Sequence, residues 1–142
     1  MIYRFKKDPE SGMIMVYVLL DGNRDFKMAL DTGATRTTFD INPLYMADYP
    51  VVKNVIETGM VETANGIVDV GIIKVDSLSA FGHTIPDMKV QVYDFLSHGI
   101  ISDYDGVLGL DFFENTVFTI DMEEQTIEVK SKKASDSPNS FF

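Results

Sequence analysis

The sequence predicts an all-β domain, a small barrel or sandwich with one or two short helical turns. Along most of the chain, hydrophobic residues alternate with polar ones at a period of two, as in half-buried strands. Turn-forming pairs, among them Asp21-Gly22 and Asn65-Gly66, separate the alternating runs. An Asp-Gly or Asn-Gly pair between two such runs is a strong local signal of a β-hairpin. These patterns favour antiparallel strands joined by tight turns.

In the first half of the chain, each expected element has its own local signal. Residues 13–22 are rich in β-branched and aromatic side chains and form a strand, and residues 24–30 return from the turn that follows it. A short strand covers residues 35–40. A short helix over residues 41–49 is expected to begin near Pro43, because proline is favoured in the first turn of a helix.

The second half is expected to contain three further hairpins and one buried strand. The hairpins turn at Ala64-Asn65-Gly66, near Gly82-His83-Thr84 and at residues 122–125. Residues 106–110 are apolar and framed by glycines, which is typical of a buried strand. Asp111 then suits the N-cap of a single helical turn.

Length and composition favour one folded domain. The chain has 142 residues, and 45% of them are hydrophobic, which argues against general disorder. A chain of this size removes roughly 68–70% of its unfolded surface from water when it folds. We expect a single domain over residues 1–130. The polar tail over residues 131–142 lacks periodicity, and we expect it to be disordered.

The charge of the chain excludes several classes of partner. It carries 22 acidic and 12 basic residues, a formal net charge of −10. Nucleic acids and anionic membranes both require a basic surface, so we expect neither as a partner. The N-terminus lacks the pattern of a signal peptide, and no apolar run approaches transmembrane length. We therefore expect a soluble cytoplasmic protein.

Metal-binding residue types are scarce. The sequence has no cysteine and only two histidines, His83 and His98, which lie in separate turn-rich stretches. A lone histidine is more often a surface or hydrogen-bonded residue than a metal ligand. We expect no metal site and no disulfide.

Asp31 stands at the end of an apolar run and is followed at once by Thr32 and Gly33. Aspartate and glycine are common turn residues, so a structural turn explains this triplet without any chemistry. The alternative is a catalytic carboxylate on a rigid loop, where glycine lets a backbone N–H approach the carboxylate. Such an acid is useful beside a second one, because two adjacent carboxylates share one proton and act as base and acid together.

Two segments together favour the catalytic alternative. ALDTGAT at residues 29–35 and GVLGLDFFEN at residues 106–115 resemble the retroviral-type (retropepsin-like) aspartic proteases, in the manner of a cellular or bacterial member. The resemblance covers roughly residues 13–130. It implies a small closed barrel in which the apolar element at residues 107–109 threads behind the catalytic loop. It also implies a β-hairpin flap over the substrate, for which ETANGIVDV has the right order in the chain.

The resemblance assigns roles to four consecutive residues of this loop. Asp31 is the implied catalytic acid. Thr32 braces the two loops of a dimer, Gly33 supplies backbone to the carboxylate and the substrate, and Ala34 borders the cleft. Thr35 departs from the retroviral pattern, which usually has aspartate there, so the resemblance carries over the chemistry but not the contacts to the substrate backbone.

The implied flap contributes Ala64, Asn65 and Gly66 to substrate binding. The sequence contains a single Asp-Thr-Gly triplet, whereas the chemistry requires two carboxylates, and 142 residues are too few for two pepsin-like lobes. A protease of this kind must therefore be a two-fold homodimer with one Asp31 from each chain. It would cleave peptide or protein substrates by attack of an activated water, without cofactor or metal.

Three alternatives stay open at this point. Glu57-Thr58-Gly59 also reads as carboxylate-Thr-Gly, but its position on the first arm of the expected flap explains it by strand alternation. A catalytically silent member of the same fold would serve as a dimerisation or peptide-binding module. In a purely structural all-β domain, Asp31 would be a turn residue.

Overall fold

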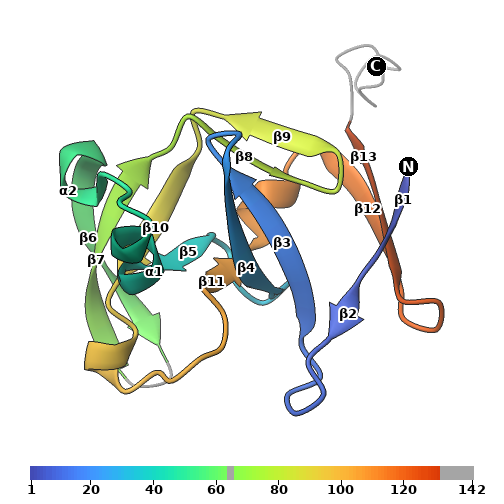
Figure 1. The fold of residues 1–142 in the computed structure, drawn as a ribbon, viewed down its shortest axis with the longest axis horizontal. Helices are drawn as coiled ribbons and strands as arrows, with labels where there is room; N and C mark the ends of the chain where they lie inside the picture. The colour runs from blue at the N-terminus through green and yellow to red at the C-terminus, as the bar shows by residue number, and fades with distance from the viewer. Residues whose placement is uncertain (64–65, 132–142) are drawn as a thin grey trace, which may run out of the picture.

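The computed structural model describes residues 1–63 and 66–131, which form two β-sheets (Figure 1). The elements are β1 (Ile2–Arg4), β2 (Lys6–Lys7), β3 (Ile14–Leu20), β4 (Arg24–Leu30), β5 (Thr38–Asp40), α1 (Ile41–Met46), α2 (Val51–Asn54), β6 (Val55–Thr63), β7 (Gly66–Lys74), β8 (Ser77–Ala80), β9 (His83–Pro86), β10 (Lys89–Tyr93), η1 (Leu96–His98), β11 (Gly106–Leu108), η2 (Leu110–Phe113), β12 (Thr116–Asp121) and β13 (Thr126–Ser131). None of the described helices is long and apolar enough to cross a membrane.

The larger sheet confirms the predicted all-β, barrel-like class. Its strands follow the order β6-β7-β10-β5-β11-β4-β3-β8-β9, and β2 pairs with β3 at one side. The sheet curls around a core in which Leu20, Met28, Phe39, Ile73 and Leu108 are almost fully buried. The helical segments among the described residues are all short, as the sequence predicts.

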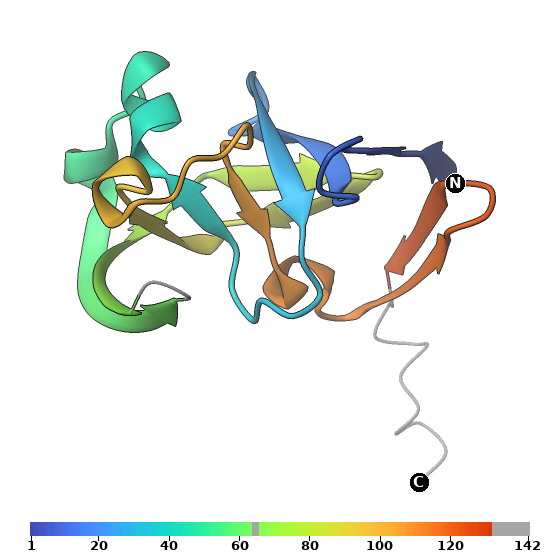
Figure 2. The same cartoon turned by 90° about the horizontal axis from the view of Figure 1, so that it is seen from below.

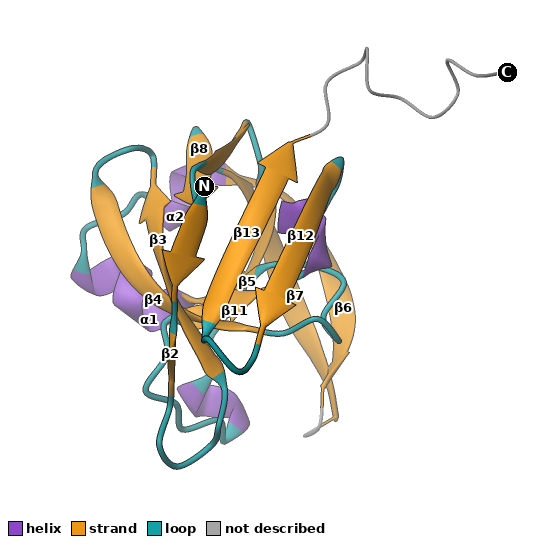
Figure 3. Cartoon of the chain, turned by 90° about the vertical axis from the view of Figure 1, so that its right-hand side faces the viewer, coloured by secondary structure: helices purple, strands orange, loops and turns teal. Residues whose placement is uncertain are grey.

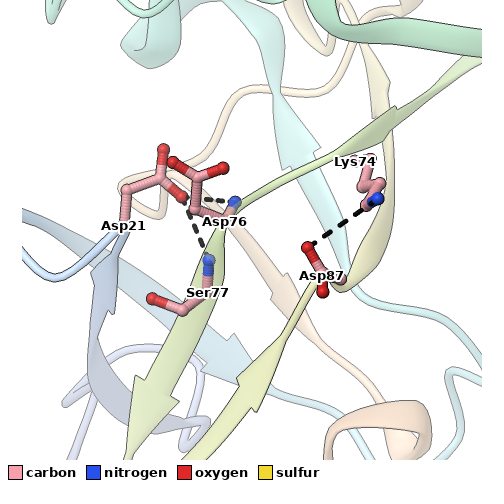
Figure 4. Close-up of polar contacts among 5 residues, drawn as sticks. All are labelled: Asp21, Lys74, Asp76, Ser77 and Asp87. Atoms are coloured by element: carbon pink, nitrogen blue, oxygen red, sulfur yellow. Dashed lines mark hydrogen bonds and ion pairs between the residues drawn. The ribbon is translucent and has the colours of Figure 1, made fainter.

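The turn between β3 and β4 forms where the sequence predicts it. Asp21 and Gly22 both have positive φ angles, 54° and 76°, a conformation that aspartate tolerates and glycine favours. Asp21 also ties this turn to the start of β8 (Figure 4), because its Oδ1 accepts hydrogen bonds from the backbone N–H groups of Asp76 and Ser77 at 2.8 and 3.2 Å.

Several predicted boundaries are wrong by a few residues. Helix α1 begins at Ile41 rather than near Pro43, because the Asp40 side chain caps it by accepting a hydrogen bond from Asn42 N. Strand β5 begins at Thr38, not at residue 35. The hairpin of β8 and β9 turns at Phe81-Gly82, whose φ angles of 54° and 72° are positive, so His83 already belongs to β9. Helices α2 and η1 have no counterpart among the predicted elements.

A second, three-stranded sheet has the order β1-β13-β12 (Figure 3). The predicted hairpin at residues 122–125 is confirmed, and the N-terminal strand β1 adds to it. Ile127 of β13 is fully buried and belongs to the same hydrophobic cluster as Phe112 and Leu20, so the two sheets share one core. Ser131 is the last residue of β13; the rest of the predicted tail, residues 132–142, lies outside the described residues.

The feature that positions the site is the insertion of β11 between β4 and β5. Strand β11 runs parallel to β4 and antiparallel to β5, although β4 and β5 are neighbours along the chain. The loop that joins them must therefore arch over the end of β11, across about twice the 4.8 Å spacing of neighbouring strands. Gly106 is required in this crowded insertion, because a Cβ atom there would lie 2.2 Å from the carbonyl oxygen of Thr38.

Candidate active site

The loop over residues 31–37 leaves β4 and crosses the end of β11. Asp31 N donates to the carbonyl oxygen of Leu108 at 3.0 Å, which extends the β4–β11 ladder by one residue. The chain then turns sharply, because Ala34 N donates back to the carbonyl oxygen of Asp31 at 3.1 Å. The aspartate is thus anchored to the sheet, while the residues after it stand at the surface.

The carboxylate of Asp31 is held by the glycine two residues later. Gly33 N donates to Asp31 Oδ1 at 2.8 Å. A Cβ atom at Gly33 would lie 3.1 Å from the same oxygen, so a glycine leaves room for this close approach. Asp31 is half-buried, whereas Thr32 and Gly33 are exposed at the tip of the loop.

The base of the loop is held by Thr37 and Asp111. Thr37 N donates to both carboxylate oxygens of Asp111 at 2.9 Å, and Thr37 Oγ1 donates to Oδ1 at 2.7 Å. The same hydroxyl accepts from Gly109 N at 3.1 Å. The predicted N-cap role of Asp111 is wrong: Gly109 occupies the N-cap position of η2, and Asp111 lies inside the helical turn. Its carboxylate instead accepts hydrogen bonds from Thr37 of the loop, because the fold places these two residues in contact.

Gly109 lets η2 pack directly against the backbone of the loop. A Cβ atom at Gly109 would lie 2.7 Å from the carbonyl carbon of Arg36 and 2.9 Å from the carbonyl oxygen of Ala34. Leu110 N donates to Ala34 O at 2.8 Å, and Asp111 N donates to Thr35 O at 3.2 Å. These contacts explain why residues 35–37 belong to a braced loop instead of the predicted strand.

A cleft of about 310 Å³ opens beside Asp31. Its other lining residues come from the loop, from the neighbouring strands and from the segment before η1: Gly33, Ala34, Thr35, Arg36, Thr38, Gln91, Tyr93, Phe95 and Val107. Asp31 is the only acid and Arg36 the only base among them. Among the described residues, a single copy of the chain therefore offers one carboxylate to this cleft.

Tyr93 and Phe95 form an aromatic wall of the cleft and are not among the predicted site residues. Their ring centroids lie 4.7 Å apart. Burial raises the pKa of Tyr93, and the negative charge of Asp40 raises it further, so the phenol keeps its proton. The alternating pattern of residues 89–93 predicts a strand, but it carries no sign of which face borders Asp31.

A larger groove, of about 750 Å³, lies along β9 and η2 and is lined by His83, Lys89 and Glu114 among others. It shares Thr35 and Arg36 with the cleft but does not reach Asp31. Size alone therefore does not select the site, and the smaller cleft is the candidate. His83 is hydrogen-bonded, as expected of a lone histidine, because its Nδ1 lies 2.8 Å from Ser131 Oγ.

The β6–β7 hairpin stands at the place in the chain where the flap is expected. Strand β6 lies at the end of the larger sheet, and Thr63 pairs with Gly66, the first residue of β7. Ala64 and Asn65 lie outside the described residues. Figure 2 shows the adjoining ends of these strands on the same side of the molecule as the loop after β4. Glu57 is exposed on β6, and four strands lie between β6 and β4 in the sheet order, which gives no support to an intrachain pair with Asp31.

These features agree with a known class of protein. The family model for aspartyl proteases matches residues 16–112, which include the Asp31 loop, the β6–β7 hairpin and β11. The chain belongs to this aspartyl protease family, and its fold is retropepsin-like.

A solved structure supports the same fold. The chain is similar to a retropepsin-like aspartic protease from Rickettsia conorii, with a TM-score of 0.61 and 16% sequence identity over 92% of this chain and 90% of that one. No curated protein matches the sequence.

Proposed function

We propose that this protein is an aspartic endopeptidase that works as a two-fold homodimer, with Asp31 of each chain in one shared site. The observation that carries the proposal is the geometry of Asp31. Its carboxylate is fixed by Gly33 N and stands in a cleft that contains no second acid among the described residues. A family whose chemistry requires two carboxylates must obtain the second from another copy of the chain.

The mechanism requires only the two carboxylates and a water molecule. Two adjacent carboxylates share one proton, because both cannot be ionised at close range. The charged Asp31 takes a proton from a water held between the pair, and this water attacks the scissile carbonyl carbon. The protonated Asp31 donates a hydrogen bond to the developing oxyanion and then assists departure of the amine. Neither a metal nor a cofactor takes part.

The remaining residues of the loop hold the pair and the substrate. Thr32 is exposed at the tip of the loop, where it would bond across the two-fold axis to the partner loop. Gly33 and Ala34 border the cleft and present backbone groups to an extended peptide. The hairpin tip, with Ala64, Asn65 and Gly66, would close over that peptide as a flap.

The decisive experiment compares the wild type with Asp31→Asn on a diverse peptide library. Asparagine keeps the shape of the side chain but cannot act as a base or acid, so cleavage should fall by several orders of magnitude. Sedimentation should show both proteins at about twice the mass of one chain at micromolar concentration. The matched control is Asp25→Asn, which removes an exposed carboxylate of β4 outside the cleft and should leave cleavage unchanged.

The other outcomes identify the alternatives. A wild type that dimerises and binds peptides without cleaving any of them would be a silent peptide-binding module. A strictly monomeric protein with full activity would rule out the shared pair. A dimer whose Asp31 residues face solvent would make Asp31 a turn residue.

A further inference from the structure

We propose that Arg36 makes the cleft selective for peptides that carry an acidic side chain close to the scissile bond. This inference rests on the proposed function and adds a substrate class to it. It follows from the position of Arg36, from the lack of a partner for its charge and from the chemistry of the other cleft residues.

The backbone of Arg36 is held in place by its neighbours. Gly109 packs against its carbonyl group so closely that a Cβ atom there would lie 2.7 Å from the carbonyl carbon and 2.8 Å from the oxygen. The next residue, Thr37, is fully buried and bonded to Asp111 through both its N–H and its hydroxyl. The guanidinium group of Arg36 therefore extends from a rigid point at the wall of the cleft.

The positive charge of Arg36 has no ion-pair partner among the described residues. Among the side chains that the structure describes, residues 1–59 and 70–131, the salt bridges join Lys74 to Asp87 and Lys130 to Glu128. Three of the four acids that line a cavity together with Arg36 are already engaged: Asp31 accepts from Gly33, Asp111 accepts from Thr37, and Asp87 pairs with Lys74. The fourth, Glu114, lines only the larger groove. Arg36 is exposed and thus available to a ligand.

No other residue in the lining of the cleft carries a positive charge. Tyr93, Phe95 and Val107 offer mainly apolar surface, and Thr38 donates its hydroxyl to Gln91 at 3.1 Å. A guanidinium group binds a carboxylate through two parallel hydrogen bonds, which is stronger and more directional than a contact to a neutral amide. The cleft thus combines an apolar wall with one cationic corner, although the whole chain carries a net charge of −10.

The test measures cleavage of paired peptides. Cleavage sites are first mapped by mass spectrometry with a random octapeptide library. Each position around the best site is then scanned with glutamate against glutamine. At one position the wild type should prefer glutamate by about tenfold in kcat/KM, and the preference should shrink at high salt. Because a ratio is measured on one enzyme sample, partial misfolding of a variant does not alter it.

Three variants decide the role of Arg36. Arg36→Gln should abolish the preference for glutamate, and Arg36→Glu should reverse it in favour of lysine at the same position. Lys89→Gln removes an equal charge from the larger groove outside the cleft, and it should keep the wild-type preference. An unchanged ratio in Arg36→Gln, or an equal loss in Lys89→Gln, would overturn the inference.

The inference and the proposed function fail in different ways. Absence of all cleavage by the wild type counts against the peptidase, whereas cleavage without a glutamate preference counts against Arg36 alone. Fluorescence anisotropy with the Asp31→Asn protein separates binding from chemistry. A mixture of labelled octapeptides with glutamate fixed at one position should bind more tightly than the matched glutamine mixture. Equal binding of the two mixtures at every position would overturn the inference even for a silent module.

Discussion

The loop after β4 and the β6–β7 hairpin lie on the same side of the molecule, but they are held in place differently. The loop is fixed by residues far away in the sequence: Asp31 bonds to Leu108, and Thr37 bonds to Asp111, 74 positions later. Strand β6 lies at the end of the sheet and pairs only with β7 among the described strands, and its residues 55–59 are exposed.

This difference suits the two roles that we propose. Catalytic groups act best when they are held in their reactive geometry before the substrate arrives. A flap must instead open and close, and such elements belong to the parts of a fold with fewer buried contacts. The same all-β architecture thus provides a braced loop and a lightly supported hairpin, and the difference comes from the long-range contacts of β11 and η2.

The largest expected effect on stability comes from a methyl group added next to the loop, and the same change in the hairpin serves as its comparison. Gly109→Ala should destabilise the protein by about 3 kcal/mol and impair cleavage, because the new Cβ would overlap the backbone of Ala34 and Arg36. Gly59→Ala on β6 is the matched control. Among the described side chains, its Cβ would meet Val70 Cγ2 at 3.9 Å, an ordinary contact distance, so stability should change by less than about 1 kcal/mol. Urea unfolding measures both, and equal losses would remove the contrast between the regions.

A smaller loss of stability is expected when the Thr37 hydroxyl group, which lies beneath the loop, is removed. Thr37→Val keeps the shape of a fully buried side chain but removes the donor to Asp111 and the acceptor for Gly109 N. The free energy of unfolding should fall by about 1–3 kcal/mol, since buried polar groups lose their partner. Thr37→Ser keeps the hydroxyl, so it should retain most of the free energy of unfolding that Thr37→Val loses with these hydrogen bonds. If serine were no better than valine in the same unfolding experiment, packing would support the loop instead.

The smallest effect concerns His83, which packs against Phe112 of η2 and makes the free energy of unfolding depend on pH. The ring of His83 packs edge-on against Phe112, and its Nδ1 bonds to Ser131. Burial lowers the pKa of His83, and the Phe112 backbone offsets this only in part. The unfolded chain therefore takes up this proton more readily, so the contribution of His83 to stability is full above about pH 6.5 and declines as the pH falls below it.

Thermal midpoints from pH 5 to pH 8 check this expectation. The wild type should lose more stability toward pH 5 than His83→Gln, which cannot titrate. A constant difference between the two proteins across this range would show that the proton on His83 has no part in the support of η2.

Local patterns account for most of the predicted elements. The hairpins at Asp21-Gly22 and at residues 122–125 are predictable, because their turn residues and alternating strands are neighbours in the chain. Asp31 stands out in the sequence for the same reason, since the apolar strand, the carboxylate and the glycine are consecutive. Predictions fail where a distant residue decides the outcome. The local pattern predicts that Asp111 caps its own helical turn, but Asp111 binds Thr37; it predicts a strand at residues 35–37, but these residues belong to the braced loop.

The sequence by itself determined the all-β class, the order of the hairpins and the single Asp-Thr-Gly carboxylate at the start of a glycine turn. These properties depend on side-chain alternation and turn conformations, which act over a few residues. Only the tertiary structure decided that β11 lies between β4 and β5, that Thr37 and Asp111 meet, and that Arg36, Tyr93 and Phe95 line the cleft of Asp31. The physical reason is that such contacts join segments many residues apart, and only the packing of the whole chain around one core brings them together.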